Sequence, residues 1–132
     1  MNEQLPNSKE AEQAVIGSVL LYPAAYYEAA KYINYTDFYI VRNQWIWQAF
    51  DHLIRTHVDI DILTVTSRLE SQNNDVGQNY LLEIINNTPT AMHAEHYAIE
   101  VSKFSSRRSI RVPTGTVDGI DSKRIRPDRL IS

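Results

Sequence analysis

Two short motifs hold the residues of this chain that could bind a metal ion or exchange protons. His93 and His96 stand three apart with Glu95 between them, so a helix would place both imidazoles on one face. Asp59 and Asp61 alternate, so in an extended segment both carboxylates point the same way, as in a cation or acid–base site. No third metal ligand follows the histidines nearby. We therefore expect solvated or helix-capping histidines, aspartates that face solvent or cap the next helix, and no metal or catalytic residue.

Nucleotide chemistry would need a phosphate cradle. The chain contains no Gly-x-x-x-x-Gly-Lys-Ser/Thr loop, whose backbone amides and lysine hold a triphosphate in the usual nucleotide hydrolases. We therefore predict that the chain is not an enzyme and needs no cofactor. Trp45, Trp47 and Phe50 could form a base-stacking platform, but their helical spacing and acidic surroundings favour core packing.

The charge is unevenly distributed along the chain. Residues 1–101 contain five Lys/Arg and 13 Asp/Glu, whereas residues 102–132 contain eight Lys/Arg and three Asp/Glu. Affinity for DNA comes largely from cationic groups that release counterions, so the acidic body is not expected to bind DNA directly. The absence of cysteine, of a long apolar run and of a signal peptide indicates a soluble cytoplasmic protein without a membrane segment.

The spacing of apolar residues predicts an all-α fold of about six helices, a compact helical head followed by an αα-hairpin. The first helix should start at a cap on Asn7 or Ser8 and stop at Tyr22-Pro23. The next helices are expected over residues 24–33 and 42–57, followed by an extended connector over 58–61. Thr64 should cap a helix that reaches Glu70, and further helices are expected over 80–85 and from 90 onward.

The hairpin is the predicted protein interface. Its apolar residues exceed what one contact with the head can cover, and an exposed apolar patch usually marks an interaction site. A cluster of tyrosines between residues 22 and 35 also exceeds what one short helix can bury, so some of them are expected at an interface. The residues predicted to contact a second copy or a partner are Tyr80, Leu81, Ile84, Ile85, Tyr97 and Val101.

The chain is expected to divide at about residue 111. Residues 1–111 form one domain, and residues 112–132 form a basic tail or linker stub. Proline and glycine interrupt that segment and little apolar periodicity remains. We therefore expect a flexible, disordered C-terminal tail.

Five motifs, in order, resemble the N-terminal (collar) domain of DnaB-type replicative DNA helicases of bacteria and phages. They are Leu5-Pro6-Asn7-Ser8 with the helix from Glu10 to Ser18, Asp37-Phe38-Tyr39, Ile60-Asp61-Ile62-Leu63-Thr64 before Arg68-Leu69-Glu70, Tyr80-Leu81, and Asn87-Thr88-Pro89-Thr90-Ala91 with Glu95-His96-Tyr97-Ala98. The likeness covers about residues 5–108.

The resemblance implies a non-catalytic domain whose hairpins pair between subunits, so that six chains form a collar on the helicase ring during DNA replication. The full-length parent would be an ATP-dependent DNA helicase. The collar would dock the C-terminal domain of DNA primase in the primosome, and a helicase loader could also touch it. An alternative is a stand-alone phage or plasmid regulatory protein that binds a helicase collar.

Overall fold

The computed structural model describes residues 8–111, and these residues form helices and connecting turns without a strand. The prediction of an all-α fold with about six helices is confirmed. In chain order the elements are α1 (Lys9–Leu21), α2 (Ala25–Ala29), the 3-10 turn η1 (Tyr35–Asp37), α3 (Val41–Arg55), α4 (Ile62–Ser71), α5 (Gln78–Asn86) and α6 (Ala94–Arg111). The predicted tail over residues 112–132 lies outside the described residues.

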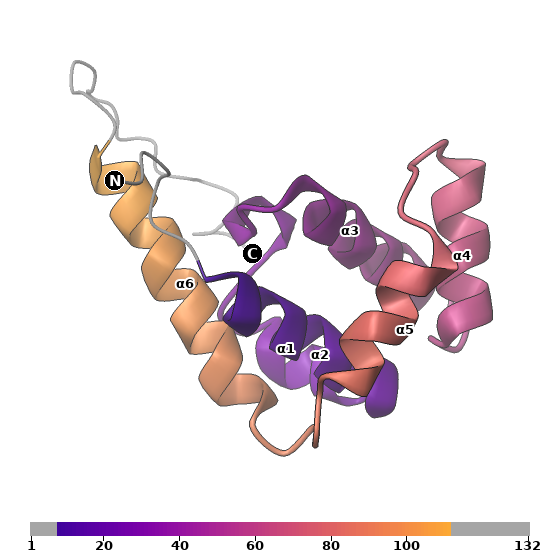
Figure 1. Ribbon diagram of the computed structural model, residues 1–132, viewed down its shortest axis with the longest axis horizontal. Helices are drawn as coiled ribbons and strands as arrows, with labels where there is room; N and C mark the ends of the chain where they lie inside the picture. The colour runs from indigo at the N-terminus through magenta and orange to yellow at the C-terminus, as the bar shows by residue number, and fades with distance from the viewer. Residues whose placement is uncertain (1–7, 112–132) are drawn as a thin grey trace.

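Helix α1 is the centre of the fold. It packs against α6, α5, α3 and α2, while α4 packs on α3 and α5. In Figure 1, α6 runs along one edge of the molecule, α4 lies at the opposite edge, and α1 and α2 lie between them. The residues of α1 that the neighbours enclose completely are Val15, Ile16, Ser18 and Val19. A helix enclosed in this way explains why its apolar stripe is broad.

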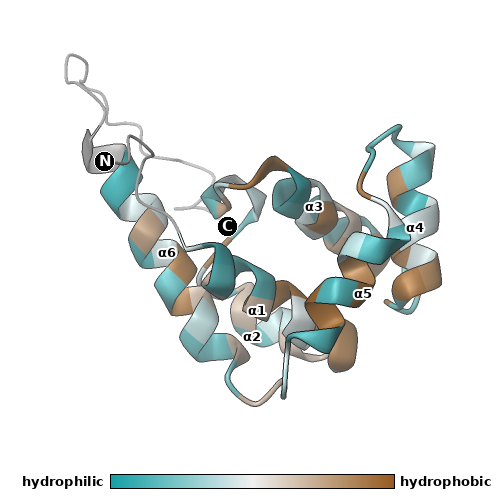
Figure 2. Ribbon diagram, viewed as in Figure 1, coloured by the Kyte–Doolittle hydropathy of each residue, from teal (hydrophilic) through white to brown (hydrophobic). Residues whose placement is uncertain are grey.

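Helices α5 and α6 are joined by a short turn, and both use α1 as their packing partner. Figure 2 shows hydrophobic and hydrophilic residues alternating around these two helices, as in amphipathic helices. Their apolar faces lie in the core of the chain: Leu81, Ile84 and Ala98 have no exposed surface and Val101 almost none. The expectation that one contact with the head could not cover these residues is therefore wrong.

One predicted helix start is confirmed and three boundaries need correction. As predicted, Ser8 caps α1, its Oγ accepting a hydrogen bond from the Ala11 amide at 3.0 Å. Asp61 rather than Thr64 caps α4: the Asp61 carboxylate accepts from the Thr64 amide at 2.8 Å, and the Thr64 hydroxyl accepts from the Asp61 amide at 2.9 Å. This reciprocal pair is a capping box. Helix α2 is shorter than predicted, and α6 begins at Ala94 instead of residue 90.

Candidate protein-interaction surface

A buried carboxylate joins α1 to the start of α3. Ile40 precedes α3 and has no side chain that could cap it. The Glu12 carboxylate of α1 holds the segment that leads into α3, accepting hydrogen bonds from the backbone amides of Tyr39 at 2.7 Å and Ile40 at 3.2 Å and from Asn43 Nδ2 at 2.9 Å. Three donors at one buried carboxylate satisfy it and fix the angle between the helices.

Opposing effects act on the Glu12 carboxyl. Burial raises its pKa above the ordinary value of 4.5, and the three hydrogen bonds and the positive charge of Arg108 lower it by smaller amounts. Arg108 lies on α6 and donates to the backbone carbonyl of Asp37 in η1. The Asp37 carboxylate accepts hydrogen bonds from the Ser105 hydroxyl at 2.7 Å and from the backbone N–H of Asn34 at 2.8 Å. These contacts hold the second half of α6 against the head.

Tyr80 connects α5 to the same network. Its hydroxyl donates to Asn43 Oδ1 at 2.7 Å and accepts from Gln13 Nε2 at 3.3 Å. The Arg42 guanidinium covers its ring at 3.9 Å from the ring centre, a cation–π contact. The aromatic ring that the sequence suggested for an interface is therefore an internal anchor.

The six residues predicted as an interface fall into two groups. Tyr80, Leu81, Ile84 and Val101 are buried within the chain, so a partner could reach them only if α5 or α6 left the head. Their prediction as exposed contacts is corrected because α1 already covers the apolar faces of both helices. Ile85 and Tyr97 are half-buried, and an interface at these two positions stays a prediction.

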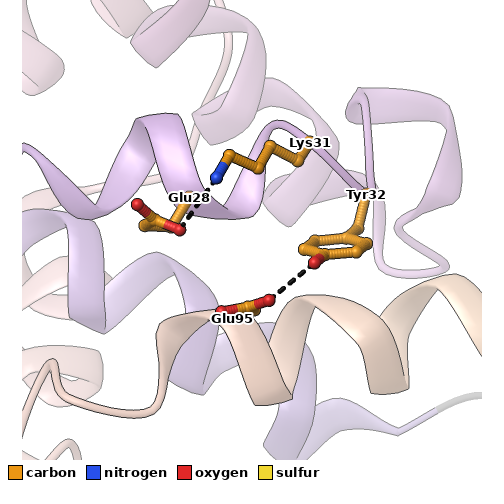
Figure 3. A network of polar contacts seen from close by, with 4 residues as sticks. All are labelled: Glu28, Lys31, Tyr32 and Glu95. Carbon is orange, nitrogen blue, oxygen red and sulfur yellow. Dashed lines mark hydrogen bonds and ion pairs between the residues drawn. The ribbon is translucent and has the colours of Figure 1, made fainter.

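The tyrosines between residues 22 and 35 are divided between core and surface. Tyr26 stacks on Trp47 and donates to the Asp51 carboxylate at 2.6 Å. The hydroxyl of Tyr32, which follows α2, donates a hydrogen bond to the carboxylate of Glu95 on α6 at 2.6 Å. Nearby, Lys31 forms an ion pair with Glu28 at 3.3 Å (Figure 3). Both polar contacts are exposed, and the one between Tyr32 and Glu95 connects the segment after α2 to α6.

Two of the most exposed apolar side chains lie where α1 turns into α2 and α5 turns into α6. Tyr22 is 60% exposed and Met92 is 81% exposed. They border a groove of about 550 Å³, called here the Met92 groove. It is lined by Tyr22, Ala24, Ala25, Glu28, Thr90, Ala91, Met92, Ala94 and Glu95. The sequence gives no signal for this groove, because Met92 stands in a turn, where helical periodicity carries no information.

The other candidates for chemistry are structural or solvated. His93 and His96 are exposed, and no group of three metal-ligating residues exists within the described part of the chain. Trp47 and Phe50 are buried as predicted, whereas Trp45 is only half-buried. Within residues 8–111, no helix is long and apolar enough to cross a membrane.

The fold and these surfaces define a class of protein: an all-α domain whose buried polar groups connect helices and whose surface carries shallow grooves. A family model described as "DnaB-like helicase N terminal domain" matches residues 4–103. The chain belongs to this family, which accounts for the absence of a phosphate loop, because the catalytic part of such helicases lies outside their N-terminal domain.

Individual relatives agree with this assignment. The chain is 39% identical to replicative DNA helicase DnaC of Bacillus subtilis (strain 168) over 121 residues, which are 86% of this chain and 26% of that protein. It is also 39% identical to replicative DNA helicase DnaB of Geobacillus stearothermophilus over 113 residues, or 83% of this chain and 25% of that protein. The chain thus spans about a quarter of the length of these relatives.

A solved structure supports the same fold. The crystal structure of the N-terminal domain of DnaB helicase from Mycobacterium tuberculosis superposes with a TM-score of 0.77 at 29% identity. The superposition covers 81% of this chain and 80% of that one. The six-helix arrangement around α1 is therefore the arrangement of this family.

Proposed function

We propose that this domain joins the subunits of a replicative DNA helicase into an oligomer and provides the surface on which primase and a helicase loader dock. Family membership supports the first part, since the relatives are replicative DNA helicases. The observation that carries the proposal is the Met92 groove. In this groove Met92 and Tyr22 stay largely exposed although the chain has buried the apolar faces of α1, α5 and α6.

The Met92 groove has the composition of an interaction site. Methionine adapts its shape to a partner, and tyrosine offers an apolar ring with a polar tip. Exposed apolar surface of this kind is favourable to bury, at about 25 cal/mol for each Å². Glu28 and Glu95 border the apolar floor and would select the charge of the incoming surface. Ile85 and Tyr97, the half-buried members of the predicted interface, remain candidate contacts.

Sedimentation velocity of the chain over a range of concentrations tests self-association. We expect the mass to rise with concentration, and the double variant Tyr22→Asp, Met92→Asp to stay lighter because it places charges on the apolar contact. Leu63→Asp is the matched control, since Leu63 is 71% exposed on α4 outside the groove. A wild type that is monomeric at every concentration, or a variant that associates like the wild type, would contradict the proposed role of the groove.

Docking is tested separately by calorimetric titration of the chain with the C-terminal domain of DNA primase from the same genome. Binding is expected for the wild type and for Leu63→Asp. If no heat of binding is detected for any variant, primase docking is wrong while the self-association result stands on its own.

A further inference from the structure

A second groove lies between α3 and α4 and reaches Tyr35 of η1. It has a volume of about 290 Å³ and is called here the Arg68 groove. Its walls carry cationic, amide and aromatic side chains together. The lining residues include Trp45, Gln48, His52, Arg55, Arg68 and Gln72.

The two arginines are unusual in this part of the chain. Residues 1–101 contain only five Lys/Arg against 13 Asp/Glu, yet Arg55 and Arg68 come from different helices to the same groove. Neither forms an ion pair among residues 8–108; the ion pair found there joins Lys31 to Glu28. In an acidic domain, carboxylates were available to neutralise both guanidinium groups. Asp51, in the same groove, interacts with the charge of Arg55, but Arg68 has no such carboxylate among the lining residues. The groove therefore keeps positive charge for an external anion.

The other ionisable groups of the groove agree with this. Partial burial, and then the charges of Arg68 and Arg55, lower the pKa of His52, so His52 lies within the positive field of both arginines. Asp51 is the acidic residue among the lining residues; its carboxylate accepts the hydrogen bond of Tyr26 at 2.6 Å and interacts with the charge of Arg55. One carboxylate faces two guanidinium groups. The charge of the groove surface is therefore positive.

We propose that the Arg68 groove binds an acidic segment of a partner protein, with carboxylates paired to Arg55 and Arg68. A guanidinium presents two parallel N–H donors that match the two oxygens of a carboxylate. The amides of Gln48 and Gln72 can bond a peptide backbone, and Trp45 offers a half-buried ring for apolar contact.

A protein segment fits the groove better than a nucleic acid does. A nucleic acid would extend its phosphates beyond the groove over a body with a large excess of carboxylates, which repels them. A short acidic segment needs only the local positive charge. This inference concerns a different face from the Met92 groove, and it holds whether or not the proposed oligomerisation does.

The two tryptophans of the chain allow a direct test. The indole N–H of Trp45 reports on the groove, and that of Trp47, which is buried in the core, serves as an internal control. The isotope-labelled chain is titrated with an unlabelled peptide of alternating glutamate and alanine and observed by NMR. We expect the Trp45 indole signal to move, the Trp47 signal to stay, and the affinity to fall as salt is added. A peptide with glutamine in place of glutamate should leave both signals unchanged.

Matched charge variants decide whether the arginines carry the binding. The double variant Arg55→Gln, Arg68→Gln should lower the affinity for the glutamate peptide on the order of tenfold or more. Lys9→Gln with Lys31→Gln removes the same charge elsewhere and should leave the affinity near that of the wild type. Thermal melts confirm that both variants fold. Equal weakening by both pairs, or an unmoved Trp45 signal, would overturn the proposal. So would tighter binding of single-stranded oligothymidylate or of inorganic phosphate than of the peptide.

Discussion

Gly17 lies at the closest contact between α1 and the turn after α5, and an alanine there should destabilise the fold. A Cβ at this position would lie 2.0 Å from Thr88 Oγ1, 2.8 Å from Thr88 Cβ and 3.1 Å from Ile84 Cγ2. Rotation of Thr88 cannot relieve the contact, because its Cβ is also too close. The Thr88 hydroxyl is moreover committed to the Ile84 carbonyl at 2.8 Å. The backbone of the turn would have to move away from α1.

Two effects of opposite sign set the magnitude for Gly17→Ala. Alanine is the better helix former, which favours the variant by about 1 kcal/mol. Overpacking of a closed contact costs about 1–3 kcal/mol, and loss of the buried Thr88 hydrogen bond adds about 1 kcal/mol or more. The balance is a destabilisation of roughly 1–3 kcal/mol. For a domain of this size it would lower the melting temperature by about 4–8 °C for each kcal/mol.

Urea unfolding of Gly17→Ala, followed by circular dichroism and tryptophan fluorescence, measures this difference. Thr88→Gly removes both atoms of the close contact, so the double variant should recover part of the loss and show a coupling energy in a double-mutant cycle. A Gly17→Ala variant as stable as the wild type would refute the reasoning, because helix propensity would then outweigh the contact.

Further predictions concern buried groups. Glu12→Ala leaves three N–H donors without an acceptor and should lower the free energy of unfolding by roughly 2–4 kcal/mol in urea titrations. Because burial raises the pKa of Glu12 above 4.5, the folded chain holds the Glu12 proton more tightly than the unfolded chain does. The proton-linked part of the stability is therefore fully present below pH 4.5 and is lost as pH rises through the raised pKa; that slope should be missing in Glu12→Ala. Ile84→Asp should unfold the chain rather than dissociate it, as it buries an unpaired charge at a cost of several kcal/mol. Leu82→Asp is its control, since Leu82 is 42% exposed on the same helix, and equal circular dichroism for both variants would contradict the burial of Ile84.

Periodicity was sufficient for the fold class because each long helix carries one clear apolar face. The boundaries were harder to predict, since they depend on hydrogen bonds that sequence spacing leaves ambiguous. Asp61 and Thr64 are both acceptable cap residues, and the structure uses them as a reciprocal pair. The start of α3 could not be found from local caps, because no side chain caps it and the segment before it is held by Glu12, 27 residues away from Tyr39.

The site was predicted less well, for a related physical reason. An apolar helix face shows that a surface is to be buried, but it does not say whether the cover is another part of the same chain or a second molecule. Helices α5 and α6 have such faces, and α1 covers both. Met92 and Tyr22, by contrast, give no periodic signal, and their exposure became visible only when the two turns were placed together.

Tyr80 shows how polar contacts can settle this ambiguity. A tyrosine at an interface typically keeps its hydroxyl in water or gives it to the partner. Here the hydroxyl lies between Asn43 and Gln13, and Asn43 in turn holds the Glu12 carboxylate. Three helices thus depend on one internal network, and a partner that pulled Tyr80 out would leave Asn43 Oδ1 and Gln13 Nε2 without this hydrogen-bond partner. Partners of this domain should therefore bind at the exposed grooves, where contact costs no internal hydrogen bond.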